Sequence, residues 1–337
     1  MLDAHENGSS EGQDIMTVKA LGYIGLGSKD PGAWLRFGVD MLGMMPARAI
    51  PGEGWGAAVD GRVPGVARDG TVFLKMDDRQ WRIAVHPTDG SRELLYLGLE
   101  LDDHISLERC AVLLQDEGYA VRHARPEEAR SRAVTGLFFC EDPSGNVLEF
   151  FYGPTTDYNF ASPVPGQRFV AGHLGLGHVN LFLDRQAACF DFYTRLLGFK
   201  LSDYIRYGEE AALQFLRCNP RHHSLAMLDF GVGNVLQHLM VEMETIDDVG
   251  KALDRAKRLG FPVVSALGRH RNDGTLSFYM RSPGTVDVEI GCEGKILDET
   301  WVANEFCEGD VWGHDGLVEA VIQSGENARR HAEPGSE

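Results

Sequence analysis

Two histidines and a glutamate in the second half of the chain have the right types to hold a metal ion. His178 lies in GLGHVNLFLD, His238 in VLQHLMVEM and Glu289 in SPGTVDVEIG, and each segment has the pattern of a strand. Two imidazoles and one carboxylate on separate strands make the facial set of ligands that suits non-haem Fe(II). If the sheet curls into a half-barrel, alternation along the strands lets the three side chains point into one cavity.

Three further residues could handle protons beside such a metal. His222 and His223 are adjacent in RHHSLAML, and His270 and Tyr279 lie in GRHRNDGTLSFYMRS. His223 could act as a base, and His270 and Tyr279 could donate hydrogen bonds to an oxyanion. The alternative is that the paired histidines lie on the surface and Tyr279 packs in a core. Spacing alone favours this alternative.

An internal repeat relates the two halves of the chain. Residues 20–44 align with 175–199, 94–118 with 236–260, and 142–151 with 282–291. The alignment places three residues of the first half opposite the three candidate ligands: Tyr23, Tyr96 and Glu149. Because tyrosine replaces both histidines, we expect the first half to hold no metal.

The repeat also predicts the fold, because each half follows the order strand, helix, three strands, twice over. We predict an α+β protein of two homologous domains, each built of two βαβββ modules that form a half-open barrel. The expected segments are a flexible leader at 1–16, a metal-free domain at 17–153, a linker at 154–170, a catalytic metal-binding domain at 171–315 and a flexible tail at 316–337. Residues 46–70 have no counterpart in the second half. Their glycines and prolines predict a loop, to which we assign no chemical role.

Composition excludes several other classes of protein. The 337 residues include 32 basic and 50 acidic ones, a net charge of −18 that disfavours nucleic acid as a partner. No apolar run approaches the roughly 20 residues of a membrane span, and the N-terminus has no export signal, so we expect a cytoplasmic protein. No two of the six cysteines are within four residues of each other, which argues against a zinc ribbon or a redox pair.

Taken in order, these motifs resemble those of the type I extradiol catechol dioxygenases of the vicinal oxygen chelate superfamily. The matching segments are GHVNL, NPRHHSLA, QHLMVE, GRHRNDGTLSFY, DVEIGCEG and the terminal WGHDG, within a resemblance that spans roughly residues 17–315. It is closest to the two-domain enzymes typified by 2,3-dihydroxybiphenyl 1,2-dioxygenase. The resemblance implies that His178, His238 and Glu289 bind Fe(II), or Mn(II) as in some relatives, with O2 as co-substrate. It also implies that His223 is the acid–base residue and that His270 and Tyr279 bond the catecholate.

The implied reaction is meta cleavage of a 3-substituted catechol, such as 2,3-dihydroxybiphenyl or a similar bicyclic catechol, in the degradation of aromatic compounds. A steroid catechol, a dihydroxynaphthalene or an alkyl catechol remains open as substrate. The expected substrate pocket contains Asn180, Met240, Asn272, Asp273 and Ser277. The family also implies a homo-oligomer, up to an octamer. The rival functions are a glyoxalase-type isomerase or epimerase on the same scaffold, and a ligand-binding protein that needs no metal.

Overall fold

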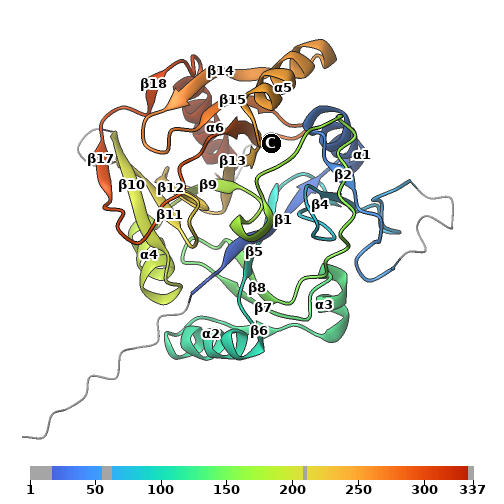
Figure 1. Ribbon diagram of the computed structural model, residues 1–337. Helices are drawn as coiled ribbons and strands as arrows, with labels where there is room; N and C mark the ends of the chain where they lie inside the picture. Colours follow the sequence, from blue (N-terminus) through green and yellow to red (C-terminus); the bar gives the residue numbers. More distant parts are fainter. Residues whose placement is uncertain (1–16, 55–62, 208–210, 333–337) are drawn as a thin grey trace, which may run out of the picture.

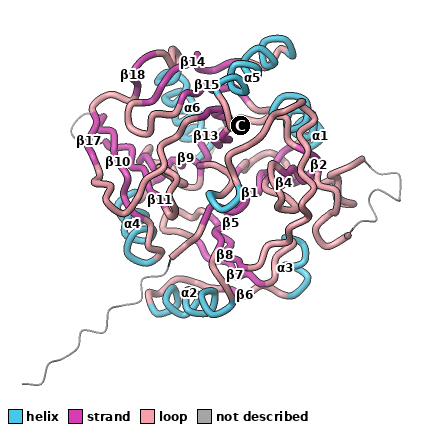
Figure 2. Tube along the Cα trace, in the orientation of Figure 1, coloured by secondary structure: helices cyan, strands magenta, loops and turns pink. Residues whose placement is uncertain are grey.

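Two mixed β-sheets, one from each half of the chain, form the framework of the molecule (Figure 1). The computed structural model describes residues 17–54, 63–207 and 211–332. The first sheet has eight strands in the order β2-β3-β4-β1-β5-β8-β7-β6, and the second has ten in the order β17-β10-β11-β12-β9-β13-β16-β15-β14-β18. The predicted α+β class is therefore confirmed. In Figure 2 the strands of both halves meet in the middle of the molecule, and helices such as α2, α3 and α4 lie at its periphery.

The elements of the first half are bounded as follows: β1 (Ala20–Ser28), α1 (Pro31–Arg36), a π-helical turn (Phe37–Leu42), β2 (Met45–Pro46), β3 (Val72–Lys75), β4 (Ile83–Pro87), β5 (Leu94–Glu100), α2 (His104–Asp116), β6 (Arg122–His123), α3 (Pro126–Arg132), β7 (Gly136–Glu141) and β8 (Val147–Tyr152).

The second half begins with a 3-10 turn (Gly172–Leu174) and continues with β9 (His178–Leu183), α4 (Gln186–Asp191), a π-helical turn (Phe192–Leu196), β10 (Lys200–Tyr207), β11 (Ala211–Arg217), β12 (Leu225–Asp229), β13 (Val235–Glu242), α5 (Ile246–Leu259), β14 (Val263–His270), β15 (Leu276–Arg281), β16 (Asp287–Cys292), β17 (Asn304–Phe306), β18 (Asp310–Trp312) and α6 (Leu317–Ala332).

The two sheets share the same central topology, as the repeat requires. In the first, β1 pairs parallel with β4 and antiparallel with β5, which pairs parallel with β8. In the second, β9 pairs parallel with β12 and antiparallel with β13, which pairs parallel with β16. This arrangement places β9, β13 and β16, the strands that carry the three candidate ligands, side by side.

Local sequence signals account for the helices that flank the sheets. In α5 the Thr245 side chain accepts a hydrogen bond from the backbone N–H of Asp248 at 3.1 Å, which caps the first turn. The helix ends at Gly260, whose φ of 75° is left-handed and favours glycine. An extensive buried apolar core then runs through both halves, from Leu21 on β1 to Val241 on β13.

The prediction of a flexible tail over 316–337 is wrong for residues 317–332, which form α6. The segment is rich in polar residues, but the helix has an apolar face: Val321 and Ala328 pack against a small cluster that contains Phe182 and Leu228. The expected leader at 1–16, residues 55–62 of the insertion and residues 333–337 lie outside the described part of the chain. Apart from Pro46, which ends β2, the described remainder of the 46–70 insertion consists of turns, bends and isolated bridges. In the part of the chain that the structure describes, no helix is both long and apolar enough to cross a bilayer.

Candidate metal centre and active site

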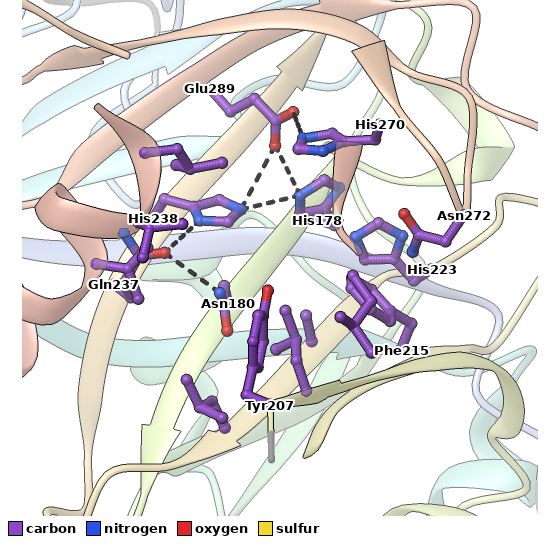
Figure 3. A pocket seen from close by; sticks show the side chains of 18 of the residues that line it. His178, Asn180, Tyr207, Phe215, His223, Gln237, His238, His270, Asn272 and Glu289 are labelled. Atoms are coloured by element: carbon purple, nitrogen blue, oxygen red, sulfur yellow. Dashed lines mark hydrogen bonds and ion pairs between the residues drawn. The ribbon is translucent and has the colours of Figure 1, made fainter. Parts of the chain in front are cut away.

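His178, His238 and Glu289 converge on one point inside the second half (Figure 3). The Nε2 atoms of the two histidines lie 3.1 Å apart. Oε2 of Glu289 lies 3.1 Å from Nε2 of His178 and 3.5 Å from Nε2 of His238. All three side chains are buried. The structure thus brings together the three residues that the repeat selected.

The hydrogen bonding of His238 prepares its Nε2 atom to bind a cation. Its Nδ1 lies 2.5 Å from Oε1 of Gln237. Because an amide oxygen only accepts, Nδ1 carries the proton and the lone pair of Nε2 points toward Glu289. Burial lowers the pKa of His238 to about 3, so the ring is neutral. Two acceptors that face each other at 3.5 Å repel unless a cation lies between them, and this donor set fits Fe(II).

The equivalent position in the first half is occupied by protein groups instead. The Tyr23 hydroxyl donates to Oε2 of Glu149 at 2.7 Å, and Nη2 of Arg132 donates to Oε1 of the same carboxylate at 2.8 Å. The guanidinium of Arg132 also lies 4.3 Å from the centre of the Tyr96 ring. Among the described residues, all the histidine and carboxylate groupings of metal-binding geometry lie in the second half. In the first half an arginine therefore neutralises the carboxylate that a metal would otherwise neutralise.

His223, His270 and Tyr279 surround the three candidate ligands. The ring centres of His223 and His178 are 3.9 Å apart. Nε2 of His270 lies 2.9 Å from the Tyr279 hydroxyl and 3.4 Å from Oε1 of Glu289. Burial, helped by the charge of Glu289, holds the pKa of Tyr279 well above its usual value, so its hydroxyl remains a donor.

Two chains of hydrogen bonds support these residues, and the sequence indicated neither of them. Behind His223, Nδ1 of His222 lies 3.1 Å from Nδ1 of His223, and Nε2 of His222 lies 2.7 Å from Oδ2 of Asp203. Asp203 comes from β10, and nothing in its own segment connects it with position 222. Burial lowers the pKa of His223 well below its usual value, with a further contribution from His178. The imidazole is therefore neutral and able to accept a proton.

The second chain orients His270. Oδ1 of Asp310 lies 2.8 Å from Nδ1 of His270 and 2.6 Å from Nδ1 of His314. Burial alone would lower the pKa of His270, but the hydrogen bonds to Asp310 and Glu289 hold it well above its usual value. The terminal WGHDG motif, residues 312–316, contains His314 and begins two residues after Asp310. It was the sequence signal nearest to this second chain, but it did not indicate the role of Asp310.

A cavity of about 350 Å³ extends from the candidate metal centre. Its polar lining consists of the three candidate ligands, the three residues that surround them (His223, His270 and Tyr279), and seven others: Asn180, Gln237, Asn272, Asp273, Asp229, Tyr207 and Asp310. The rest of the lining is apolar: Ile205, Ala211, Leu213, Phe215, Ala226, Leu228, Phe230, Gly309, Leu317, Val318, Val321 and Ile322. Volumes of about 300–1,000 Å³ are typical of sites for drug-sized ligands, so the cavity is larger than one unsubstituted ring requires.

Three of the five expected pocket residues line this cavity, namely Asn180, Asn272 and Asp273, whereas Met240 and Ser277 do not. Met240 pairs with His178 on one side and Glu289 on the other, so it lies within the row of ligands and not along the cavity. The Ser277 hydroxyl is 3.1 Å from Nε2 of His314. Strand alternation identifies a face of a sheet but not the depth of a residue along it.

Gln237 was missed for the opposite reason. Alternation places it on the face opposite to His238, yet both residues line the cavity. The register between β9 and β13 shifts between Leu236 and His238, as it does at a β-bulge. The bulge turns Gln237 toward the site, where its Oε1 also accepts a hydrogen bond from Nδ2 of Asn180 at 3.2 Å.

Comparisons with known proteins agree with this geometry. Residues 175–290 match the family model of the Glyoxalase/Bleomycin resistance protein/Dioxygenase superfamily. The chain is 38% identical over 314 residues to an iron-dependent extradiol dioxygenase of Rhodococcus jostii, covering 90% of this chain and 99% of the relative. It is 37% identical over 309 residues to a biphenyl-2,3-diol 1,2-dioxygenase of a Pseudomonas species, with the same two coverages.

Solved structures show the same similarity in three dimensions. A halotolerant catechol dioxygenase superposes with a TM-score of 0.80 at 31% identity, covering 90% of this chain and 96% of that one. A catechol 2,3-dioxygenase superposes with a TM-score of 0.77, also at 31% identity and with the same coverages. These matches confirm the family that the motifs indicated. The chain belongs to the type I extradiol catechol dioxygenases of the glyoxalase, or vicinal oxygen chelate, superfamily.

Proposed function

We propose that this protein uses Fe(II) and O2 to open a 3-substituted catechol beside its diol, with 2,3-dihydroxybiphenyl or a similar bicyclic catechol as substrate. The observation that carries the proposal is the convergence of His178, His238 and Glu289 beside a cavity whose remaining wall is largely apolar. The diol of such a substrate would lie at the polar end and its substituent against the apolar wall. Relatives at 34–35% identity include a 3-methylcatechol 2,3-dioxygenase and a 1,2-dihydroxynaphthalene dioxygenase, so smaller and fused-ring catechols are the competing substrates.

In this proposal His178, His238 and Glu289 hold the iron, with Mn(II) as the alternative metal. When bound, the iron would bring the catechol oxygens and O2 together and allow electrons to pass from the ring to oxygen. Gln237 keeps His238 in the tautomer that offers Nε2 to the metal. Two imidazole ligands and a single carboxylate would leave a bound Fe(II) ion with a net positive charge, which favours a catecholate over a neutral diol.

His223 is the proton carrier of the proposed reaction. Its Nδ1 is turned toward His222, which leaves Nε2 for the cavity. A neutral imidazole at this position takes a proton from a catechol hydroxyl and returns it during ring opening. His222 and Asp203 stabilise the imidazolium that exists between the two transfers, because Asp203 is buried and paired with His222.

His270 and Tyr279 hold the resulting anion in place. The Tyr279 hydroxyl remains protonated and His270 is held cationic by Asp310, so both can donate to the catecholate. Donors that face an oxyanion inside a dry site contribute more than the same donors in water. They also orient the ring, which determines the bond that breaks.

Specificity constants of the anaerobically Fe(II)-loaded protein for 2,3-dihydroxybiphenyl, 3-methylcatechol and 1,2-dihydroxynaphthalene test the substrate assignment. We expect a yellow ring-fission product, one O2 consumed per turnover and the highest constant for the biphenyl diol. A protein that binds these catechols without consuming O2 would be a ligand-binding member of the superfamily instead. A higher constant for 3-methylcatechol would overturn the choice of substrate.

The role of His223 has its own test. His223→Gln should bind iron as the wild type does, yet lose about 10²–10⁴-fold in kcat, the usual contribution of general acid–base catalysis. His173→Gln is the control, because this exposed histidine lies away from the cavity. Wild-type turnover by the His223→Gln variant would exclude the assigned role.

We also propose a homo-oligomer in solution. The proposal follows from the resemblance to the family, which implies a homo-oligomer up to an octamer. Light scattering on the purified protein tests this, and a monomer at micromolar concentration would contradict it.

A further inference from the structure

Helix α6 forms one wall of the cavity. Four of its side chains line it: Leu317, Val318, Val321 and Ile322. Residues at these spacings lie on one side of a helix. All four are apolar, and none of the charged residues of α6 lines the cavity. The wall is therefore suited to hydrocarbon and not to a polar substituent.

The part of the wall formed by Val321 lies far from the candidate metal centre. Val321 packs against the cluster that contains Phe182, which is at the other end of β9 from His178. At about 3.3 Å per strand residue, the four-residue step between Phe182 and His178 corresponds to roughly 13 Å. A lone catechol ring held by the metal is too short to reach Val321, whereas a substituent beyond the ring can reach it.

The position of α6 is set by contacts with Phe230, which lies directly against the helix. Gly325 faces the ring of Phe230 so closely that a Cβ atom there would lie 2.1 Å from Cε1 of that ring. Nε of Arg329 donates to the Phe230 carbonyl at 2.6 Å, and its guanidinium lies 4.4 Å from the ring centre. Phe230 itself lines the cavity. The glycine thus permits a close approach that places the four apolar side chains against the cavity.

The start of α6 is attached to the catalytic end of the site. The backbone N–H of Leu317 donates to the carbonyl of His314 at 3.0 Å. His314 shares Asp310 with His270, as described above. Gly313 has a φ of 75°, and a Cβ atom there would lie 2.3 Å from the carbonyl oxygen of Leu267, so the turn before the helix has little freedom. Both ends of α6 are therefore held.

We propose that α6 is the specificity wall of this enzyme: Leu317, Val318, Val321 and Ile322 contact the substituent of the catechol and select substrates that carry a large apolar group over those that carry a small one. This inference rests on the proposed function and names the part of the chain that reads the substrate. Val318 and Ile322 are about half exposed, which places them at the mouth, where the substituent enters.

Val321→Phe tests the inference by filling the space in front of the wall. We expect kcat/KM for 2,3-dihydroxybiphenyl to fall at least about 10-fold, because a pocket wall of this kind discriminates by about 10–200-fold per hydrophobic group. The constant for 3-methylcatechol should stay within about 2-fold, since the small substituent does not reach Val321. The matched control is Glu319→Phe, which adds the same ring to the exposed side of the same helix.

A second variant works in the opposite direction and does not depend on accommodating a larger side chain. The double substitution Val321→Ala with Ile322→Ala removes wall contacts and should raise KM for 2,3-dihydroxybiphenyl about 3- to 10-fold while leaving KM for 3-methylcatechol unchanged. Equal changes for both substrates, or no change for either, would overturn the specificity role of α6 while leaving the proposed function intact. A wild-type protein that cleaves neither catechol would instead overturn the proposed function and this inference with it.

Discussion

Gln237 offers a sharp test of how the second half prepares its proposed metal ligands. Its Oε1 accepts the Nδ1 proton of His238 at 2.5 Å and a second hydrogen bond from Asn180 at 3.2 Å. In Gln237→Leu the buried Nδ1–H of His238 loses its acceptor. The tautomer with the proton on Nδ1 is then no longer favoured, so the Nε2 lone pair is available to the metal in only part of the molecules. Loss of such an outer hydrogen bond costs about 10–100-fold in metal affinity, or about 1.4–2.7 kcal/mol.

The assay is an anaerobic Fe(II) titration in competition with a chelator of known affinity. Gln237→Glu keeps an acceptor at the same position and should bind iron at least as tightly as the wild type. Gln214→Leu makes the same change on β11, at a residue that does not line the cavity, and should leave the affinity unchanged. Wild-type iron affinity in Gln237→Leu, or an equal loss in Gln214→Leu, would refute the reasoning.

Two further predictions concern partly buried carboxylates. Asp310→Asn removes the charge that holds His270, so kcat/KM should fall about 10²-fold in steady-state assays, whereas the exposed neighbour Asp315→Asn should have wild-type kinetics. Burial alone would raise the pKa of Asp77, but the charge of Arg82 lowers it below its usual value, so this pair stabilises the fold above about pH 4 and the stabilisation is lost as the pH falls through the lowered pKa. Asp77→Asn should therefore cost about 2–3 kcal/mol in urea unfolding at pH 7 and markedly less near pH 3, and a pH-independent difference would contradict the assignment.

The triad could be predicted from the sequence because the repeat compares equivalent strand positions. The two halves differ at two of these three positions, where Tyr23 and Tyr96 replace the histidines. The comparison itself therefore selects His178, His238 and Glu289 as the candidate ligands. The fold class followed from the same repeat, since each half alternates strands and helices in one order.

The supporting groups could not be predicted, because they depend on long-range pairing. Asp203 reaches His222 only through the arrangement of β10 beside β11 and β12, and Asp310 reaches His270 through the pairing of β14 with β18. Gln237 depends on a register shift that strand alternation does not describe.

The structure also explains why the first half of the chain keeps its glutamate without a metal. Glu149 is present in the first half, as the repeat predicts, but Arg132 from α3 supplies its positive charge. The sequence repeat does not reveal this partner, because it lies outside the aligned segments. Helix α6 was missed for a different reason, since its apolar residues are few and their packing partners lie nearly 100 residues away on β12 and beyond.

The central claim is that one half of the molecule holds the iron and the other does not. The most direct measurement is the iron content per chain of protein loaded with Fe(II) under anaerobic conditions and then freed of excess metal, for the wild type and for Glu289→Ala. We predict one iron per wild-type chain and none in the variant. Two irons per wild-type chain, or one iron retained by Glu289→Ala, would contradict the account.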